Sequence, residues 1–149
     1  MQLEGQRDVA AGIDEVRRGL HDPDLLMRVV PRCQELAAVG PDHVVVVLAF
    51  ATGRLADTYR GMLTVRDTRE GLRFTLDVHG PTGGLGIDLR ATLSPLATGG
   101  TRVHYVAHVT LGGLAARAIT SSIDAVADQL ATRVCGNLTT ALAEGPALV

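Results

Sequence analysis

Hydrophobic and polar residues alternate along most of the middle of this chain. The alternation is cleanest in Leu72–His79, Leu85–Ser94 and Arg102–Leu111, where every second residue is apolar and most of the others are polar or charged. This period of two is typical of antiparallel strands that have one face on a core and the other in water. Further strands are predicted at Gln2–Ala10, Leu36–Val39, His43–Thr52 and Leu55–Arg66.

Two short helices are predicted between the first and second strands. Ala11–Leu20 has apolar residues at helical spacing, and Asp24–Val30 is a second, mostly apolar helical segment. Pro23 separates the two, with Asp22 as a suitable N-cap for the second helix, and Pro31 ends it.

Leu114–Ala143 predicts one long C-terminal helix, about 45 Å in length at about 1.5 Å per residue. Its apolar residues recur in steps of three and four: Ile119, Ile123, Val126, Leu130, Val134, Leu138 and Leu142. Only this helix is long enough to cover the apolar face of the sheet, and twisted strands must curl around it. We therefore expect an α+β fold in which a curved antiparallel sheet of about seven strands grips the helix and leaves a cavity at its flanks.

Composition limits the classes of function. The 149 residues fit a single domain over residues 1–149, with 145–149 as a frayed tail. Apolar residues make up 46% and aromatic residues only 3%, so the core must be mainly aliphatic, which leaves room for a ligand more easily. The net charge of −2 and the scattered basic residues argue against nucleic-acid binding.

No metal site or bound cofactor is predicted. Cys33 and Cys135 are too few and too far apart for a disulfide framework or a zinc site, so we expect free thiols. His104 and His108 lie about 13 Å apart along one strand, too far to share an ion. Gly80–Gly86 is glycine-rich but no helix follows it, so it predicts a hairpin or a pocket lid rather than a phosphate loop.

The longest apolar run, Val44–Ala51, is far too short to span a bilayer, and the N-terminus has no apolar signal core. We expect a cytoplasmic protein, for which peripheral contact with a membrane stays open.

Several short motifs occur in order along the chain: Leu3–Gly5, Asp22–Pro23 followed by Pro31–Leu36, Tyr59–Gly61, and Gly99–Tyr105. In order and spacing they resemble the CoxG family of carbon monoxide dehydrogenase subunits, within the START-like, or SRPBCC, superfamily, over roughly Met1–Leu142. The resemblance implies the helix-grip fold and a non-enzymatic role linked to a molybdenum-type oxidoreductase. It further implies that the protein carries a lipophilic quinone or a similar lipid, or assists maturation.

Two departures from the family pattern stand out. Arg32 occupies a position that is usually Gly. Some relatives carry a long C-terminal tail that reaches a membrane, whereas this sequence stops at Val149, which puts such a contact in doubt.

The predicted cavity is lined by aromatic residues of the sheet and by the helix stripe. The expected ligand-binding residues are Phe50, Asp57, Tyr59, Phe74, Tyr105, Ile119, Ile123, Val126 and Leu130. Asp57 shares strand parity with inward residues, so it either anchors a polar headgroup or lies at the sheet rim beside Arg54. Each tyrosine offers an apolar ring and one hydroxyl, which suits a ligand with one polar end, although ordinary core packing is the alternative.

Two other functions remain open. A cyclase or aromatase would need an acid or base in the cavity, for which Asp57 and Tyr59 are the pair available. A protein-interaction subunit or a homodimer would use Val45 and Val47, because His43–Thr52 is apolar on both faces. Coverage of that outer face by the early helices is the alternative.

Overall fold

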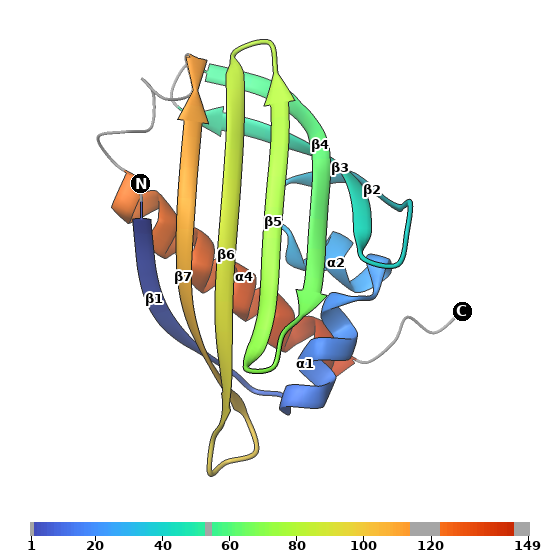
Figure 1. The fold of residues 1–149 in the computed structure, drawn as a ribbon, viewed down its shortest axis with the longest axis vertical. Helices are drawn as coiled ribbons and strands as arrows, with labels where there is room; N and C mark the ends of the chain where they lie inside the picture. The colour runs from blue at the N-terminus through green and yellow to red at the C-terminus, as the bar shows by residue number, and fades with distance from the viewer. Residues whose placement is uncertain (1, 53–54, 114–122, 145–149) are drawn as a thin grey trace.

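The computed structural model describes residues 2–52, 55–113 and 123–144 (Figure 1). The elements follow the predicted order of one strand, two short helices, six strands and a C-terminal helix. They are β1 (Gln2–Val9), α1 (Ile13–Leu20), α2 (Pro23–Val29), β2 (Cys33–Ala38), β3 (His43–Thr52), β4 (Leu55–Asp67), β5 (Gly71–Gly80), β6 (Gly83–Pro95), β7 (Thr101–Gly112) and α4 (Ile123–Glu144). The first part of the predicted long helix, residues 114–122, lies outside the described residues.

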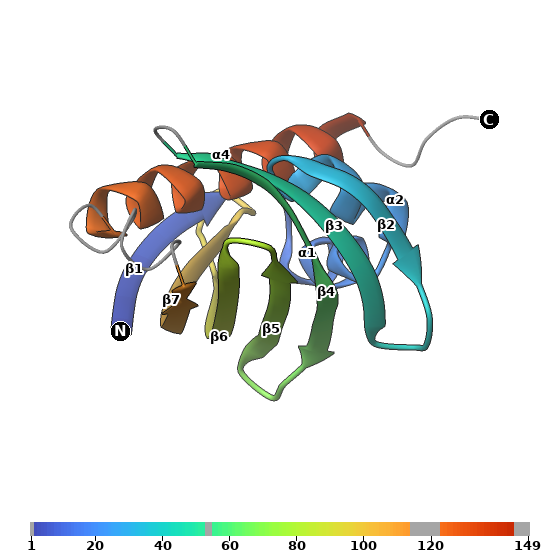
Figure 2. The ribbon, with the colours of Figure 1, turned by 90° about the horizontal axis from the view of Figure 1, so that it is seen from above.

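All seven strands form one antiparallel sheet in the order β1-β7-β6-β5-β4-β3-β2. Strands β1 and β2, which the two short helices connect, therefore lie at opposite edges. Figure 2 shows that the sheet is strongly curved and that α1, α2 and α4 lie on its concave side. The predicted fold class, a curved antiparallel sheet around a C-terminal helix, is confirmed.

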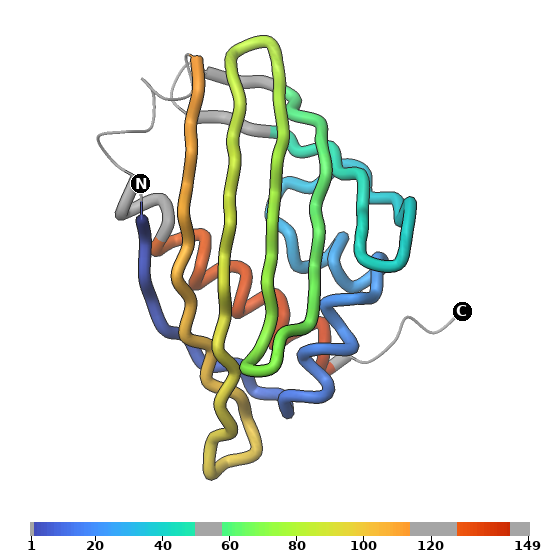
Figure 3. Tube along the Cα trace, in the orientation of Figure 1, coloured from blue at the N-terminus to red at the C-terminus, as the bar shows by residue number. Residues whose placement is uncertain are grey.

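The short helices begin and end for local reasons. Asp22 caps α2, because its carboxylate accepts a hydrogen bond from the Asp24 amide at 3.0 Å. Pro23, which we predicted as a break, is the first residue of α2, where a missing N–H costs nothing. The chain then returns to the sheet edge, as the Cα trace in Figure 3 shows. Arg32 makes this turn with a positive φ of 61°. Strand β2 begins directly after it at Cys33, earlier than predicted, because Cys33 and Glu35 already pair with β3.

The main core lies where the C-terminal half of α4 meets the two short helices and the β2–β5 side of the sheet. Val16, Leu26 and Val29 of the short helices are buried together with Leu138 and Ala141 of α4. Helix α4 contacts α1, α2 and the edge strand β1. One end of the concave face is therefore filled by side chains from all three described helices.

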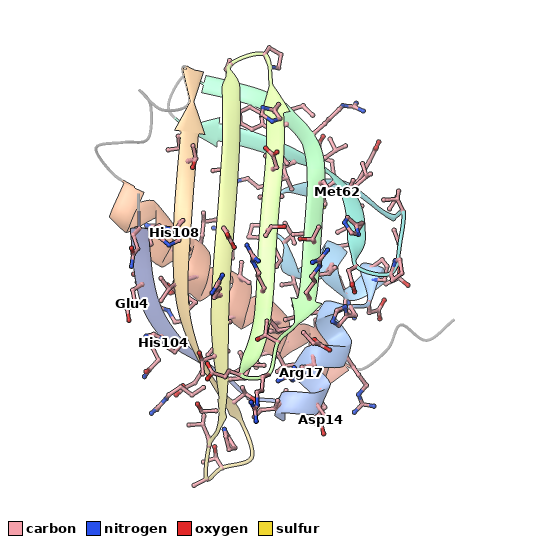
Figure 4. All side chains as sticks on the ribbon, viewed as in Figure 1. Glu4, Asp14, Arg17, Met62, His104 and His108 are labelled. Atoms are coloured by element: carbon pink, nitrogen blue, oxygen red, sulfur yellow. The ribbon has the colours of Figure 1, made fainter. Side chains whose placement is uncertain are left out.

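The convex face of the sheet is polar, as the alternation predicted, and its charges are paired across strands. The pairs are Glu4–His104 at 2.7 Å, Asp8–Arg102 at 3.1 Å and Arg73–Asp88 at 2.9 Å. Figure 4 shows Glu4 of β1 beside His104 of β7 on this face. The Arg73 hydrogen bond holds the pKa of the Asp88 carboxyl below its usual range.

The convex side of β3 is an exception to this polar pattern. Val45 is 38% exposed there, but Val47 on the same side is only 5% exposed. Helices α1 and α2 lie on the concave side, where Val44 and Val46 are buried with α2, so they do not cover the convex side of β3. The suggested dimer or partner surface at Val45 and Val47 stays a prediction.

Candidate ligand-binding site

The concave face of β5, β6 and β7 carries a row of apolar side chains that the protein does not fully cover. Strand register places them beside fully buried inward residues such as Val78 and Ala91. Phe74, Leu76 and Leu85 are partly exposed and pack against the main core. The other partly exposed members of this row are Ile87, Leu89, Tyr105 and Leu111. Part of the apolar concave face is therefore accessible, and the cavity expected between the sheet and the helix stays a prediction.

Helix α4 carries an apolar stripe that is buried at one end and exposed toward the other. Leu130, Val134 and Leu138 are spaced by four residues and therefore point to the same side of the helix. Leu138 is only 4% exposed and Val134 packs against the core, but Leu130 is 41% exposed. The apolar stripe is thus buried in the C-terminal part of α4 and becomes exposed toward the N-terminal part. The expected cavity-lining position of Leu130 stays a prediction.

The two tyrosines, which the sequence could not distinguish, have different environments. Tyr59 is 2% exposed, belongs to the main core, and its hydroxyl lies 3.0 Å from the Thr82 hydroxyl. Its ring also lies against Gly80. Tyr59 is thus a packed residue whose polar atom already has a partner.

Tyr105 is only partly buried, and its ring crosses the neighbouring strand. Gly5 is its register partner on β1, and a Cβ atom built on Gly5 would lie 2.5 Å from Cζ of Tyr105. Glycine is therefore required at this position for the ring to lie across β1. Burial is the main cause that raises the pKa of Tyr105; Asp128 and Cys135 raise it further, while Arg7 lowers it.

Arg7 is a functional candidate that our sequence analysis missed. It shares strand parity with Gly5 and Val9, so its side chain lies on the concave side and reaches α4. Nε donates to the Thr132 hydroxyl at 3.2 Å, and Nη2 pairs with the Asp128 carboxylate. An arginine at an inward position of an otherwise small or apolar strand face was the signal that could have revealed it.

The remaining predicted site residues are only partly described. Phe50 of β3 and Asp57 of β4 are direct register partners, but their side chains lie outside the described part of the structure. The same holds for the side chains of Ile123 and Val126 on α4, and Ile119 lies outside the described residues altogether. Phe74 lies at the margin of the main core, next to Leu89 in the register.

Other candidate features carry no binding chemistry of their own. Within the described ranges, no three His, Cys, Asp or Glu side chains are grouped as metal ligands would be. Both cysteines are free, and burial raises the pKa of each thiol. Residues 80–83 form the tight β5–β6 hairpin, which confirms the hairpin alternative for the glycine-rich segment. None of the helices described in residues 2–144 has the length and hydropathy needed to cross a bilayer.

A surface hollow of about 480 Å³ lies near the β6–β7 turn. Its lining comes from Asp8, Val9, Ala10, Leu96, Thr98, Gly99, Gly100 and Thr139. This lining contains none of the predicted ligand-binding residues.

Several solved structures are similar to this chain. A conserved protein from Geobacillus kaustophilus has a TM-score of 0.86 at 19% identity, over 97% of this chain and 96% of that one. A START superfamily protein from Mycobacterium smegmatis has a TM-score of 0.65 at 10% identity, over 96% and 97%. The ZhuI aromatase/cyclase from Streptomyces sp. R1128 has a TM-score of 0.59 at 16% identity, over 95% and 90%. At these identities the similarity shows the START-type fold.

A search among curated proteins finds no match. The sequence profile of CoxG, the G-type subunit of carbon monoxide dehydrogenase, matches residues 5–143. This range runs from Gly5, beneath the Tyr105 ring, to the last turn of α4. The chain belongs to the CoxG family of carbon monoxide dehydrogenase subunits.

Proposed function

We propose that this protein binds a hydrophobic small molecule with one polar end, such as a lipophilic quinone, in the hollow between β5–β7 and α4. It holds the molecule without converting it. The observation that supports this role is the row of inward apolar side chains that the protein leaves partly exposed, opposite the exposed Leu130. Without a ligand, this surface would remain in contact with water at a cost in free energy.

The size of the effect is sufficient for useful binding. Each methylene group removed from water contributes about 0.8 kcal/mol, so a ten-carbon chain contributes about 8 kcal/mol. Association and ordering cost at least about 4 kcal/mol of this amount. At that lower limit of the cost, the remainder together with one hydrogen bond and the burial of a ring sets micromolar affinity as the upper bound.

The family description supports a partner as well as a ligand. We propose that the protein serves a molybdenum-type oxidoreductase as an accessory or carrier subunit, because its family is described as a subunit of carbon monoxide dehydrogenase. Co-expression with a tagged molybdenum subunit of such an enzyme should give a complex that survives gel filtration. Independent elution of the two proteins, with and without bound quinone, would contradict the partner proposal.

The cyclase alternative has weaker support. Of the pair that we predicted for acid–base chemistry, the Tyr59 hydroxyl is bonded to Thr82 within the core and does not face the hollow. The likeness to an aromatase/cyclase concerns the fold. Turnover of a polyketide-like substrate by the wild-type protein, abolished in Asp57→Asn, would favour the enzyme over the carrier.

The ligand site can be tested by filling it. Leu130→Trp places a large ring at the mouth of the hollow, where the exposed position can accept it without disturbing the core. We expect binding of hydrophobic probes to weaken at least about tenfold, while the melting temperature stays within about 2 °C of wild type. Arg133→Trp, at an exposed position on the same helix, is the matched control and should bind as wild type does.

Two measurements complete the test. Native mass spectrometry and organic extraction of the purified protein should reveal a bound lipophilic compound. Because the wild-type chain has no tryptophan, the introduced indole also reports its own surroundings, and its emission should shift to the blue in Leu130→Trp but not in Arg133→Trp. Equal probe binding by both variants would place the ligand elsewhere, and failure of every hydrophobic probe to bind wild type would refute the function.

A further inference from the structure

The hydroxyl of Tyr105 is a polar group that the described protein atoms leave available on the concave face. No hydrogen bond to this hydroxyl is present among the described residues, in contrast to the hydroxyl of Tyr59. The ring lies across Gly5, so its oxygen lies over the edge strand β1, the strand that α4 contacts. We call this meeting place of β1, β7 and α4 the seam. Tyr105 is only partly buried, and no described side-chain N or O atom is both buried and without a hydrogen-bond partner, so this hydroxyl is accessible to water. A ligand that displaces the water can supply an acceptor in its place.

The charges around this hydroxyl are already paired. Arg7 of β1 and Asp128 of α4 are the charged groups among the causes of its pKa shift, after burial. The Arg7 guanidinium is committed to Asp128, to Thr132 and, through Nη1, to the Gln6 carbonyl at 2.7 Å. The Cys135 thiol is neutral at physiological pH because burial raises its pKa. The seam therefore offers one neutral donor and, among the described residues, no free positive charge.

This arrangement discriminates between two kinds of polar end. A carboxylate that leaves water needs a cation of its own. The cation described beside Tyr105, the Arg7 guanidinium, is 26% exposed and is already paired with Asp128, whose side chain is 72% exposed. A ketone or quinone carbonyl needs only one hydrogen-bond donor, and Tyr105 provides it. An uncharged carbonyl compound therefore fits this seam better than a fatty acid does.

On the basis of the proposed function, we infer that the head of the ligand lies at the seam between β1, β7 and α4. There the Tyr105 hydroxyl donates a hydrogen bond to an uncharged carbonyl oxygen, and the Arg7–Asp128 ion pair disfavours carboxylates. Tyr105 is thus a binding residue, and Asp128 determines specificity by keeping Arg7 occupied.

Three hydrophobic probes separate these roles: one has no polar group, one has an uncharged polar end and one has a charged end. Diphenylhexatriene is a pure hydrocarbon, decylubiquinone carries uncharged carbonyl groups on a ten-carbon chain, and dodecanoate is a carboxylate of similar length. Dissociation constants for all three are measured by fluorescence or equilibrium dialysis with the full chain. Wild type should bind diphenylhexatriene and decylubiquinone, and should bind dodecanoate at least about tenfold more weakly than the quinone.

Two variants then test the two residues: Tyr105→Phe removes one oxygen atom, and Asp128→Asn removes the charge with almost no change in shape. Tyr105→Phe should weaken decylubiquinone binding about fivefold, the effect of one hydrogen bond, without changing diphenylhexatriene binding. Asp128→Asn should release Arg7 and tighten dodecanoate binding about tenfold, while decylubiquinone changes less than about twofold. Asp88→Asn removes the same charge from an Arg–Asp pair on the convex face and is the matched control, expected to change none of the three constants.

The outcomes separate this inference from the proposed function. If diphenylhexatriene and decylubiquinone both fail to bind wild type, the proposed function itself is refuted. If both bind but Tyr105→Phe leaves decylubiquinone unaffected, or if Asp128→Asn leaves dodecanoate unaffected, the ligand site stands and the head-group assignment is overturned.

Discussion

The contact between Gly5 and Tyr105 can be tested by adding one methyl group. In Gly5→Ala the new Cβ would lie 2.5 Å from Cζ and 3.0 Å from Cε1 of Tyr105, so the ring must move away from β1. Such overpacking costs about 1–3 kcal/mol. Replacing a strand glycine by alanine itself contributes about 0.5–1 kcal/mol of stability. The expected net effect in the wild-type background is a loss of about 1 kcal/mol.

The effect should change sign when the ring is absent. In a Tyr105→Ala background only the favourable glycine-to-alanine contribution remains, so Gly5→Ala should stabilise by about 0.5–1 kcal/mol. Urea unfolding of the four proteins, followed by circular dichroism, gives the coupling free energy of the cycle. Gly86→Ala is the control, because its Cβ would come no closer than 3.7 Å to a neighbour; it should stabilise equally in both backgrounds. Equal effects of Gly5→Ala in the two backgrounds would refute the packing of Tyr105 over β1.

Three further predictions concern the scaffold. Arg32 adopts a positive φ of 61°, so Arg32→Gly should stabilise the protein by about 0.5 kcal/mol in urea unfolding, and a lower midpoint would contradict the strain. The buried Thr101 hydroxyl donates to the Ala11 carbonyl at 2.7 Å, so Thr101→Val should cost about 1–3 kcal/mol in the same assay, and a neutral result would count against this bond. The hydrogen bond from Arg73 lowers the pKa of Asp88, so its stabilisation is present above the ordinary carboxyl pKa and is lost as the pH falls through the lowered value. Thermal unfolding between about pH 5 and pH 3 should therefore depend less on pH in Asp88→Asn than in wild type, and parallel curves would disprove the contribution.

The order of the elements and the polar face of the sheet could be predicted from the sequence because both depend on local patterns. The period of two in β5, β6 and β7 assigns each side chain to one face, whatever the strand pairs with. The four-residue spacing of Leu130, Val134 and Leu138 likewise defines one side of α4. The start of β2 was predicted wrongly: the strand begins at Cys33 because its first residues pair with β3 across a register shift that the alternation does not show.

Which polar groups meet in the hollow could not be predicted, because it depends on contacts between distant parts of the chain. Parity gave Tyr59 and Tyr105 the same inward direction, but only the curvature of the sheet and the course of α4 put one in the core and left the other at the seam. Arg7 and Asp128 are 121 positions apart in the sequence, and no periodicity relates them. The sequence by itself determined which face each side chain is on; the tertiary structure decided what lies opposite it, because a partner on another element is set by how the two elements pack and not by the pattern of either one.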